Sequence, residues 1–385
     1  MLTESWRWFG PKDPITLEHI KMTGVTEVIF ALYDIPIGDV WQIEDILKYK
    51  QLIHESGLKW EVVESIPVHE SIKYGGNDRD QYINNYIQSI ENISKAGIHI
   101  LCYNFMPVVD WTRTDLKFLN GNGNVSLRFD YIDFIIFDIF ILKRNGTYSE
   151  QIIEEARTKY MKLSRDELDV LSNTILRGLP GSMVEKNHSL SDFHGKLLKY
   201  KDKSKEELQS NLCYFLKKIC PIAEKNKIYL AIHPDDPPID LFDIPRIVSS
   251  LADLQFICQA YKSEFNGITL CVGSMASNLE NDCEDITKQM IDKINFLHLR
   301  NVTKDGRNSF VESGHLNGDV NMIRILDLLI SVLGKGKKIH FRPDHGELLF
   351  DEVNNDHVNP GYSLYGRFGG LCQLRGVIQT LSYIK

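Results

Sequence analysis

The segment Ile228–Ile232, with the sequence IYLAI, decides the fold, and the polar motif HPDD follows it directly from position 233. Two other unbroken apolar runs have the same character: VIFAL at Val28–Leu32 and ITLCV at Ile268–Val272. A strand that is apolar at every position has to be covered on both faces, as strands of parallel sheets are. These three segments therefore predict a parallel sheet that is enclosed by helices.

Further strand candidates extend this pattern along the chain. The eight candidates are Trp6–Gly10, Glu27–Leu32, Lys59–Glu64, His99–Asn104, Ile228–His233, Ile268–Gly273, Asn295–Arg300 and Lys338–Pro343. Amphipathic stretches with apolar residues three and four apart lie between them, at Ile43–Ser56, Arg79–Lys95, Lys205–Asn226 and Val320–Leu333. Alternating strands and helices give a parallel sheet, and eight such units favour a closed (β/α)8 TIM barrel over an open doubly wound sheet.

Residues 105–204 interrupt this repeat between the fourth and fifth strands. The segment contains the glycine-rich stretch Gly121–Asn124, a helical pattern at Ser149–Tyr160 and a helix start at Arg165. A structureless loop of this length would be unusual in a compact domain. We therefore expect one α/β barrel domain over residues 1–385, with 105–204 as a mostly helical insertion at the C-terminal rim. Such an insertion could act as a lid over the site, and it would not be an independent domain.

Composition and charge exclude several classes of protein. The chain carries 44 Lys and Arg against 52 Asp and Glu, a net charge of −8, which argues against a nucleic-acid partner. The most apolar run, Tyr131–Leu142, is too short to span a bilayer, so we expect no membrane partner. The seven cysteines are odd in number and form no CxxC pair, and the N-terminus does not resemble a secretory signal. We therefore expect free thiols and a cytoplasmic location.

Motifs for three common enzyme classes are missing from the sequence. It has no GxxxxGK[ST] phosphate loop, no GxGxxG after a strand and no GxSxG nucleophile elbow. These absences argue against a nucleotide hydrolase, a dinucleotide-dependent dehydrogenase and an α/β-hydrolase.

Four consecutive strand candidates end in side chains that bind metals well. These residues are His233, Cys271, His298 and Asp344. The C-terminal ends of parallel barrel strands meet at one mouth, where TIM barrels have their active sites. Imidazole, thiolate and carboxylate groups at that mouth could surround one divalent cation. Each residue alone also fits a structural role, as a hydrogen-bonded buried histidine, a small apolar cysteine or a helix cap, so the hypothesis depends on their coincidence.

Arginine, histidine and tyrosine residues near these strand ends are candidates for substrate and proton chemistry. Arg300 and Arg342 each lie two positions from a proposed ligand, on the same strand face, where either could clamp a substrate carboxylate. Tyr362 follows Pro-Gly and fits a plain turn, but a nearby cation would lower the pKa of its phenol and make it a proton carrier. The other candidates for substrate contact are Arg7, Arg113 and His315, which also fit packing or turn roles.

A series of motifs runs through the chain from Trp6 to about Gly376. In order they are WRWFGPKDP, GDVW, VVESIPVHE, CYNFMPVVDWTRTDL, AIHPDDPP, CVGS, HLRN, HLNGDV, RPDHGE and NPGYSLYGR. The set resembles the mannonate dehydratase family, whose members have xylose-isomerase-like TIM barrels. In one place the sequence departs from that pattern, with ALYDIP at Ala31–Pro36 where close relatives carry an ALHHIP-like stretch.

The resemblance implies an activity, a cofactor and site residues. It implies removal of water from D-mannonate to give 2-keto-3-deoxy-D-gluconate in hexuronate (glucuronate) catabolism, by an enzyme that is commonly a homodimer. It also implies Mn²⁺ or Fe²⁺ as the metal, although the donor set would suit Zn²⁺ as well. By the family pattern the metal ligands are His233, Cys271, His298 and Asp344, and the acid/base residues are His345 and Tyr362. We expect Tyr362 to act as base and His345 as acid, with Asp344 as a possible proton relay and the two main roles exchangeable.

Two alternatives stay open from the sequence. A metal-dependent sugar isomerase or epimerase would use the same barrel and a similar site, and only the product would separate it from a dehydratase. A catalytically inactive barrel that binds a sugar acid or a partner would also fit the fold, although the complete set of metal ligands argues against it. A Zn²⁺ endonuclease fits poorly, because the chain is acidic and has no basic stripe.

Overall fold

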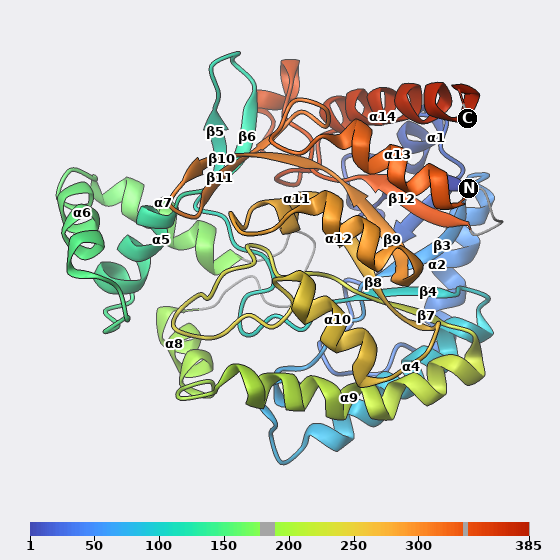
Figure 1. Ribbon diagram of the computed structural model, residues 1–385, viewed down its shortest axis with the longest axis horizontal. Coiled ribbons are helices and arrows are strands. Elements are labelled where there is room, and N and C mark those ends of the chain that lie inside the picture. Colours follow the sequence, from blue (N-terminus) through green and yellow to red (C-terminus); the bar gives the residue numbers. More distant parts are fainter. Residues whose placement is uncertain (178–188, 334–337, 385) are drawn as a thin grey trace.

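The computed structural model describes residues 1–177, 189–333 and 338–384. Eight parallel strands close into a barrel in the order β1-β12-β9-β8-β7-β4-β3-β2, which confirms the predicted (β/α)8 fold (Figure 1). The barrel strands are β1 (Leu2–Arg7), β2 (Glu27–Phe30), β3 (Lys59–Glu64), β4 (Ile100–Tyr103), β7 (Tyr229–Ile232), β8 (Asn266–Cys271), β9 (Ile294–Leu299) and β12 (Ile339–Pro343).

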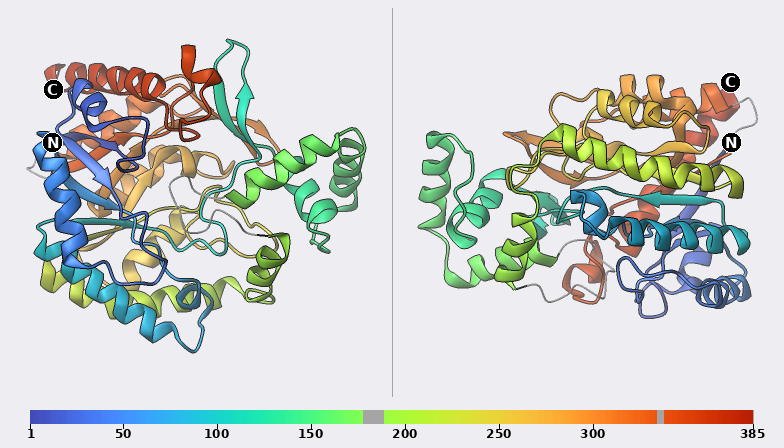
Figure 2. Two further views of the ribbon diagram at one scale, coloured as in Figure 1. Left: turned by 180° about the vertical axis from the view of Figure 1, so that it is seen from behind. Right: turned by 90° about the horizontal axis from the view of Figure 1, so that it is seen from below.

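Helices surround this barrel on its outside (Figure 2). They are α1 (Leu17–Met22), α2 (Ile43–Glu55), α3 (Glu70–Tyr74), α4 (Arg79–Lys95), α9 (Lys205–Asn226), α10 (Leu251–Ala260), α11 (Val272–Ala276), α12 (Cys283–Met290), α13 (Met322–Leu333) and α14 (Leu364–Ile384). Two short 3-10 helices, η2 (Ile291–Lys293) and η3 (Phe350–Asn354), complete the connections. The long helices α2, α4, α9 and α13 match the four amphipathic stretches predicted from the sequence.

The first strand was predicted too late in the chain. Strand β1 pairs with β12 through Leu2–Glu4 and with β2 through Ser5–Arg7, whereas the sequence indicated Trp6–Gly10. The segment LTES at positions 2–5 is largely polar, so a search for apolar runs misses it. Gly10, at the predicted end, has a φ of +94°, which breaks the extended backbone and requires glycine.

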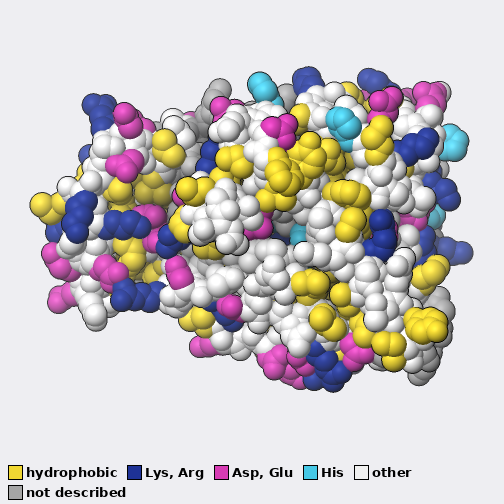
Figure 3. Space-filling view, turned by 90° about the horizontal axis from the view of Figure 1, so that it is seen from above, with side chains coloured by type: hydrophobic (Ala, Val, Ile, Leu, Met, Phe, Trp, Pro, Cys, Tyr) yellow, Lys and Arg dark blue, Asp and Glu magenta, His cyan; other side chains and the backbone are white. Residues whose placement is uncertain are grey.

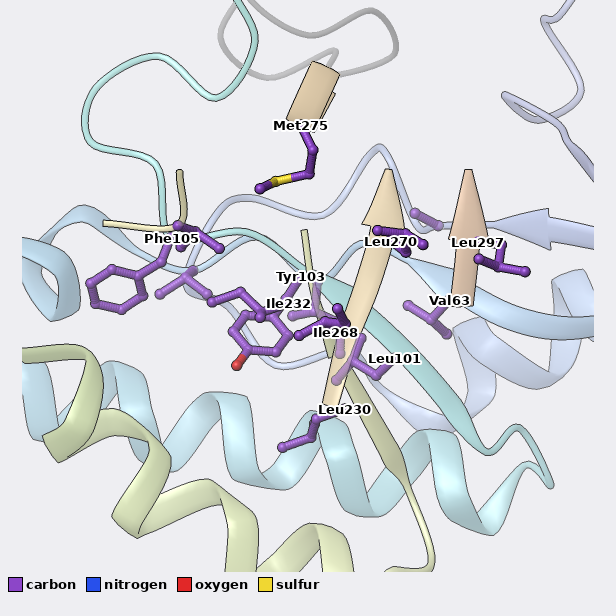
Figure 4. Packing of buried hydrophobic residues seen from close by; sticks show 14 of the residues in the cluster. Val63, Leu101, Tyr103, Phe105, Leu230, Ile232, Ile268, Leu270, Met275 and Leu297 are labelled. Atoms are coloured by element: carbon purple, nitrogen blue, oxygen red, sulfur yellow. The ribbon is translucent and has the colours of Figure 1, made fainter. Parts of the chain in front are cut away.

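Alternation along the strands separates an inner core from an outer one. The inward residues Ile29, Val62, Cys102, Ala231 and Phe296 form a small cluster inside the barrel. Outward neighbours, including Val63, Leu101, Leu230, Leu270 and Leu297, belong to the large core (Figure 4). Because strand side chains alternate, the residue two positions beyond an inward one also faces inward, closer to the C-terminal mouth. This rule places Glu64, His233 and His298 at the mouth, beyond Val62, Ala231 and Phe296.

The insertion is mostly helical, as predicted, but it also contains a β-hairpin that the sequence did not lead us to expect. Strands β5 (Asp115–Leu119) and β6 (Val125–Phe129) flank the Gly121–Asn124 stretch, which forms the hairpin turn. The helices are α5 (Tyr131–Ile135), the π-helix η1 (Ile136–Ile141), α6 (Glu150–Tyr160), α7 (Arg165–Arg177) and α8 (Leu190–Leu198). The rest of the predicted insertion includes residues 178–188, which lie outside the described residues.

A second sheet joins this hairpin to the barrel. Strands β10 (Asn301–Gly306) and β11 (Ser309–Ser313) follow barrel strand β9, and the four strands are ordered β10-β11-β6-β5. Phe310 and Val311 of β11 pair with Phe129 and Arg128 of β6 in an antiparallel arrangement. We call these four strands the accessory sheet. It lies beside the barrel mouth, while α6 stands farthest from the barrel (Figure 1).

The surface shows a mixture of charges. Lys, Arg, Asp and Glu side chains are interspersed on the face drawn in Figure 3, and the hydrophobic side chains lie in separate small patches. Within the described ranges, no helix has both the length and the apolar character needed to cross a membrane.

Candidate active site

The predicted metal ligands lie at the mouth ends of four barrel strands. Cys271 ends β8 and His298 lies near the end of β9, and the strand register places the two directly opposite each other. His233 follows β7, and Asp344 follows β12. Cys271, His298 and Asp344 are buried, and His233 is half-buried. The strand register therefore brings Cys271 and His298 together, and His233 and Asp344 come from the ends of the two flanking strands.

The donor atoms are close enough to share one ion. The ligand atoms of His233, Cys271 and His298 all lie within 4.8 Å of one another. Asp344 Oδ2 is 3.8 Å from His298 Nδ1 and 3.8 Å from Cys271 Sγ. A tetrahedral ion with bonds of about 2.0–2.3 Å separates its ligand atoms by about 3.3–3.8 Å. His233, Cys271 and His298 thus form a group that fits a single divalent cation, and Asp344 lies beside two of the three.

Polar neighbours orient the two imidazoles toward this point. His233 Nδ1 donates to the Pro234 carbonyl over 2.6 Å, which leaves Nε2 with a lone pair. His298 Nε2 lies 3.4 Å from Glu64 Oε2 without making a hydrogen bond, and the negative charge of Glu64 favours the tautomer with its proton on Nε2, which leaves a lone pair on Nδ1. His233 Nε2 and His298 Nδ1 face each other at 3.1 Å. Two facing lone pairs need a cation or a proton between them, and such outer hydrogen-bond partners are typical of metal-binding histidines.

Two arginines hold Glu64 above this group of donors. Arg7 Nη1 lies 2.8 Å from Glu64 Oε1, and Arg342 donates from Nη2 and Nε to the two oxygens over 2.9 and 3.0 Å. Burial would raise the pKa of Glu64, but Arg342 and Arg7 outweigh it and hold that pKa well below its usual range. Burial would also raise the pKa of Asp344, but the charges around it, above all that of the contacting Arg342, outweigh burial and hold this pKa well below its usual range. Both carboxylates are therefore ionised at neutral pH.

A pocket of about 450 Å³ opens above the donors. The predicted site residues that line it are Arg7, His233, Arg342, Asp344, His345 and Tyr362. The rings of His345 and Tyr362 meet edge to face with centroids 5.3 Å apart, and Arg7 Nη1 donates to the Tyr362 hydroxyl over 3.4 Å. Burial raises the pKa of Tyr362, and the opposing charges of Arg7 and Arg342 do not reverse this.

Arg113 and Arg300 do not line the pocket. Both are almost fully buried, and both bind the same two carboxylates. Arg113 contacts Asp236 over 2.8 Å and Glu312 over 2.6 Å, and Arg300 contacts them over 2.6 and 2.5 Å. Burial would raise the pKa of Asp236, but the charges of Arg113 and Arg300 outweigh burial and lower this pKa. The two arginines thus form a charge-balanced network behind the pocket, where their charges are already neutralised.

His315 is also close to the site without lining the pocket. Its side chain is buried, and the ring packs so closely against Gly370 that a Cβ at that glycine would lie 2.1 Å from His315 Nδ1. Burial lowers the pKa of His315 to about 4, so the ring is neutral at physiological pH. Its Nε2 has no hydrogen-bond partner among the described residues.

The structure adds three acidic residues that the sequence analysis did not select. Glu64 ends β3 at a position equivalent to the chosen strand ends, so the same rule would have found it. Asp236 belongs to the quoted HPDD motif but was not singled out. Glu312 lies in β11 of the accessory sheet, and no barrel-based rule pointed to it.

A larger chamber leads to the pocket and shares Arg7, Ser65, Asn104 and Asp110 with it. The chamber lies between the loops after β2 and β3 and the insertion helices α7 and α8. Its cationic lining residues besides Arg7 are Lys73, Arg177, Lys196 and Lys199, and its acidic ones are Glu70 and Asp110. This approach is more basic than the chain as a whole.

The ALYDIP stretch forms part of this chamber through Tyr33, Ile35 and Pro36. The Tyr33 hydroxyl donates to the Trp8 carbonyl over 3.3 Å, and its ring lies 5.5 Å from that of Phe9. Asp34 is exposed. The departure from the family pattern therefore places a tyrosine in the wall of the approach, outside the group of metal donors.

Comparison with known proteins decides the family. A family model described as D-mannonate dehydratase (UxuA) matches residues 2–385. The chain belongs to the mannonate dehydratase family. Mannonate dehydratase 2 of Agrobacterium fabrum is 42% identical over 99% of this chain and 97% of its own length. The mannonate dehydratase of Saccharophagus degradans is 40% identical over 100% of this chain and 99% of its own.

Solved structures agree with this assignment. The crystal structure of mannonate dehydratase from Streptococcus suis serotype 2 superposes with a TM-score of 0.80 at 36% identity, covering 100% of this chain and 96% of that one. L-ribulose 3-epimerase and a D-psicose 3-epimerase from Clostridium cellulolyticum give TM-scores of 0.50 and 0.52 at 12% and 11% identity. At that identity the epimerases show only a shared barrel fold. Mannonate dehydratases are hydro-lyases, and the chain is an enzyme of that class.

Proposed function

We propose that this chain removes water from D-mannonate to give 2-keto-3-deoxy-D-gluconate, a step of hexuronate catabolism. Membership of the mannonate dehydratase family supports the substrate. The observation that carries the proposal is the gathering of His233, Cys271, His298 and Asp344 next to two proton-carrying side chains, His345 and Tyr362. By the family resemblance we also propose a cytoplasmic homodimer, and light scattering tests the dimer.

A divalent cation, Mn²⁺ or Fe²⁺ by family resemblance, would be held by His233, Cys271, His298 and Asp344. The two facing lone pairs of His233 and His298 support this assignment. The donor set also suits Zn²⁺, so the choice of metal requires measurement. When bound, the ion would act as a Lewis acid that stabilises negative charge on the substrate's carboxylate and C2 oxygen.

The dehydration requires a base for the C2 proton and an acid for the C3 hydroxyl. The pKa of Tyr362 is raised by burial, so its phenol keeps its proton at neutral pH and suits the acid role. His345 is then the base. The sequence led us to expect Tyr362 as base and His345 as acid, with the two roles exchangeable. The roles proposed here are the exchanged ones.

The proton transfers balance over one turnover. His345 first takes the C2 proton, and the electron pair left at C2 is delocalised into the substrate carboxylate. That pair then forms the C2=C3 double bond as the C3–O bond breaks. Tyr362 protonates the departing hydroxide, which leaves as water. The resulting enol returns its hydroxyl proton to the Tyr362 phenolate, and C3 takes the proton from His345. The product is the 2-keto acid, and both side chains are restored.

Arg7 and Arg342 are the arginines that face the pocket, so we propose that they hold the substrate carboxylate. Guanidinium groups bind carboxylates in a planar, bidentate manner. Their present partner, Glu64, fixes both side chains at the pocket wall. Arg113 and Arg300, the other candidates from the sequence, are engaged behind the wall.

One assay tests this function. Protein stripped of metal and then supplied with Mn²⁺, Fe²⁺ or Zn²⁺ is incubated with D-mannonate, and the products are identified by mass spectrometry. A product lighter than the substrate by one water supports the dehydratase. A product of unchanged mass would indicate an isomerase or epimerase, and no turnover with any metal would indicate a barrel that only binds.

A further inference from the structure

We infer that Glu312 is a positioning residue for the reaction: its carboxylate holds the Nδ1 proton of His345 and thereby keeps His345 Nε2 free to accept a proton in the pocket. The kinetic part of this inference rests on the proposed function of His345. The structural part concerns the tautomer of one imidazole and can be tested without any turnover.

The contact itself joins two parts of the fold. Glu312 lies in β11 of the accessory sheet, and its side chain is buried. His345 follows barrel strand β12, and its Nδ1 is 3.0 Å from Glu312 Oε1. A hydrogen bond at this distance fixes which ring nitrogen carries the proton, provided that the partner can only accept.

Two arginines ensure that Glu312 can only accept. Arg300 Nη1 and Arg113 Nη2 donate to the same oxygen, Oε1, over 2.5 and 2.6 Å. Burial would raise the pKa of Glu312, but Arg300, His345 and Arg113 outweigh it and hold the pKa far below its usual range. An ionised carboxylate has no proton to donate, so the proton of the hydrogen bond belongs to His345 Nδ1.

The rest of the His345 ring is held in place as well. Its Nε2 lies 3.8 Å from Asp344 Oδ1, so the free nitrogen faces the corner of the pocket where the metal donors meet. The rings of Trp111 and Tyr362 meet the imidazole edge to face, with centroids 5.9 and 5.3 Å away. Rotation of the ring would break the bond to Glu312, so the carboxylate sets both tautomer and orientation.

This arrangement also gives Arg113 and Arg300 a role other than the one expected from the sequence. Each binds Glu312 and also Asp236, so two cations and two carboxylates neutralise each other. The network holds Glu312 ionised and in place. Arg113 therefore acts on the reaction through Glu312 and His345, whereas Arg300 also lies 3.2 Å from Asp344 Oδ2, an oxygen of a proposed metal ligand.

The direct test is ¹⁵N NMR of histidine-labelled protein loaded with diamagnetic Zn²⁺, with the His345 signal assigned by its loss in His345→Gln. We expect wild-type His345 to show the Nδ1–H tautomer, with a pyrrole-like Nδ1 shift and a pyridine-like Nε2 shift. A wild-type ring with its proton on Nε2 would overturn the inference. This measurement needs no variant of Glu312 and so does not depend on whether such a variant folds.

A matched pair of variants adds the kinetic test. Glu312→Gln removes the charge with little change in shape, and we expect kcat to fall by about 100-fold or more while KM changes by less than about threefold. The shorter carboxylate of Glu312→Asp should recover part of kcat. The control is Glu347→Gln. Glu347 also binds the hairpin of the accessory sheet, at Ser126 over 3.2 Å and Asn120 over 2.8 Å, but among the described residues no hydrogen bond or ion pair joins its side chain to His345.

The outcomes separate this inference from the proposed function. An equal fall of kcat in Glu312→Gln and Glu347→Gln would mean that Glu312 only stabilises the sheet, which contradicts the inference. Wild-type protein with the Nδ1–H tautomer but no dehydration of mannonate would contradict the proposed function and leave the tautomer assignment standing.

Discussion

His233 and His298 face each other nitrogen to nitrogen, with Nε2 of the first 3.1 Å from Nδ1 of the second. The far nitrogen of His233 donates to the Pro234 carbonyl, and that of His298 lies 3.4 Å from Glu64 Oε2. The two rings are therefore set up as a pair of acceptors before any ion arrives. Cys271 and Asp344 lie beside them with their donor atoms directed at the same space.

Loss of one of these donors should remove the metal. We expect His298→Ala and Cys271→Ala to lose stoichiometric metal and turnover together while the protein remains folded, because three donors from four leave an incomplete coordination shell. Elemental analysis and circular dichroism measure the two properties. Cys283→Ala is the control, since Cys283 is a buried free thiol outside the cluster. Full metal occupancy in either ligand variant would show that the replaced side chain is not a ligand.

The acid and base roles can be separated by isotope exchange. In D₂O, we expect Tyr362→Phe to form product at least about 100-fold more slowly but still to introduce deuterium at C2 of recovered mannonate, because His345 remains. His345→Gln should lose both activities. NMR of the recovered substrate measures the exchange. If His345→Gln kept the exchange and Tyr362→Phe lost it, the assignment with Tyr362 as base would be restored.

The basic approach to the pocket should affect substrate binding in a salt-dependent way. Lys199 is exposed and lines the chamber, so Lys199→Glu should raise KM for mannonate by about three- to fivefold at low ionic strength, with kcat unchanged. The effect should shrink above about 0.3 M salt, where the charges are screened. Lys217→Glu on α9 changes the net charge equally at an exposed position outside the chamber lining. An equal rise in KM for both variants would exclude a local effect.

Glu70 should make stability depend on pH. It accepts hydrogen bonds from Lys73 over 2.7 Å, Tyr200 over 2.6 Å and the Val108 amide over 3.1 Å, and so ties α3 to the insertion. Burial would raise its pKa, but Lys73, Tyr200 and Val108 outweigh it and lower the pKa. A carboxyl group with a lowered folded-state pKa stabilises the fold above its unfolded pKa of about 4.3, and this stabilisation is lost as the pH falls through the folded value.

Urea unfolding of Glu70→Gln measures this contribution. We expect the variant to be less stable than wild type by about 1–3 kcal/mol at pH 7, because a half-buried, hydrogen-bonded charge is replaced. The difference should narrow as the pH falls below about 4. Glu154→Gln on α6, where the side chain is 70% exposed, should change the free energy of unfolding by less than about 0.5 kcal/mol. A difference for Glu70→Gln that does not depend on pH would contradict the assigned pKa shift.

The barrel and the candidate metal donors could be predicted from the sequence for a simple reason. Buried parallel strands are continuous apolar runs, and a polar residue that interrupts such a run at its C-terminal end has to face the mouth. His233, Cys271 and His298 all follow this pattern. Strand β1 does not, because its first residues are polar and its pairing is fixed by neighbours far away in the sequence.

The remaining features depend on contacts between loops. The hairpin β5–β6 pairs with β11. Strand β6, with the sequence VSLRF, does alternate between apolar and polar residues and could have been found, whereas β11, with SFVES, has no such alternation. Glu312 becomes part of the site only after that pairing has formed. The burial that raises the pKa of Tyr362 also depends on how deeply the ring is enclosed, which a sequence does not show.

The accessory sheet has a consequence for the order of events during folding. Its central pair joins Arg128 to Val311, and Glu312 is carried on the second of these strands. Consider a chain that has formed its barrel but has not yet paired β6 with β11. It would already bind metal, but without Glu312 in place His345 would not be held in the Nδ1–H tautomer. During refolding, metal uptake should therefore precede the recovery of turnover.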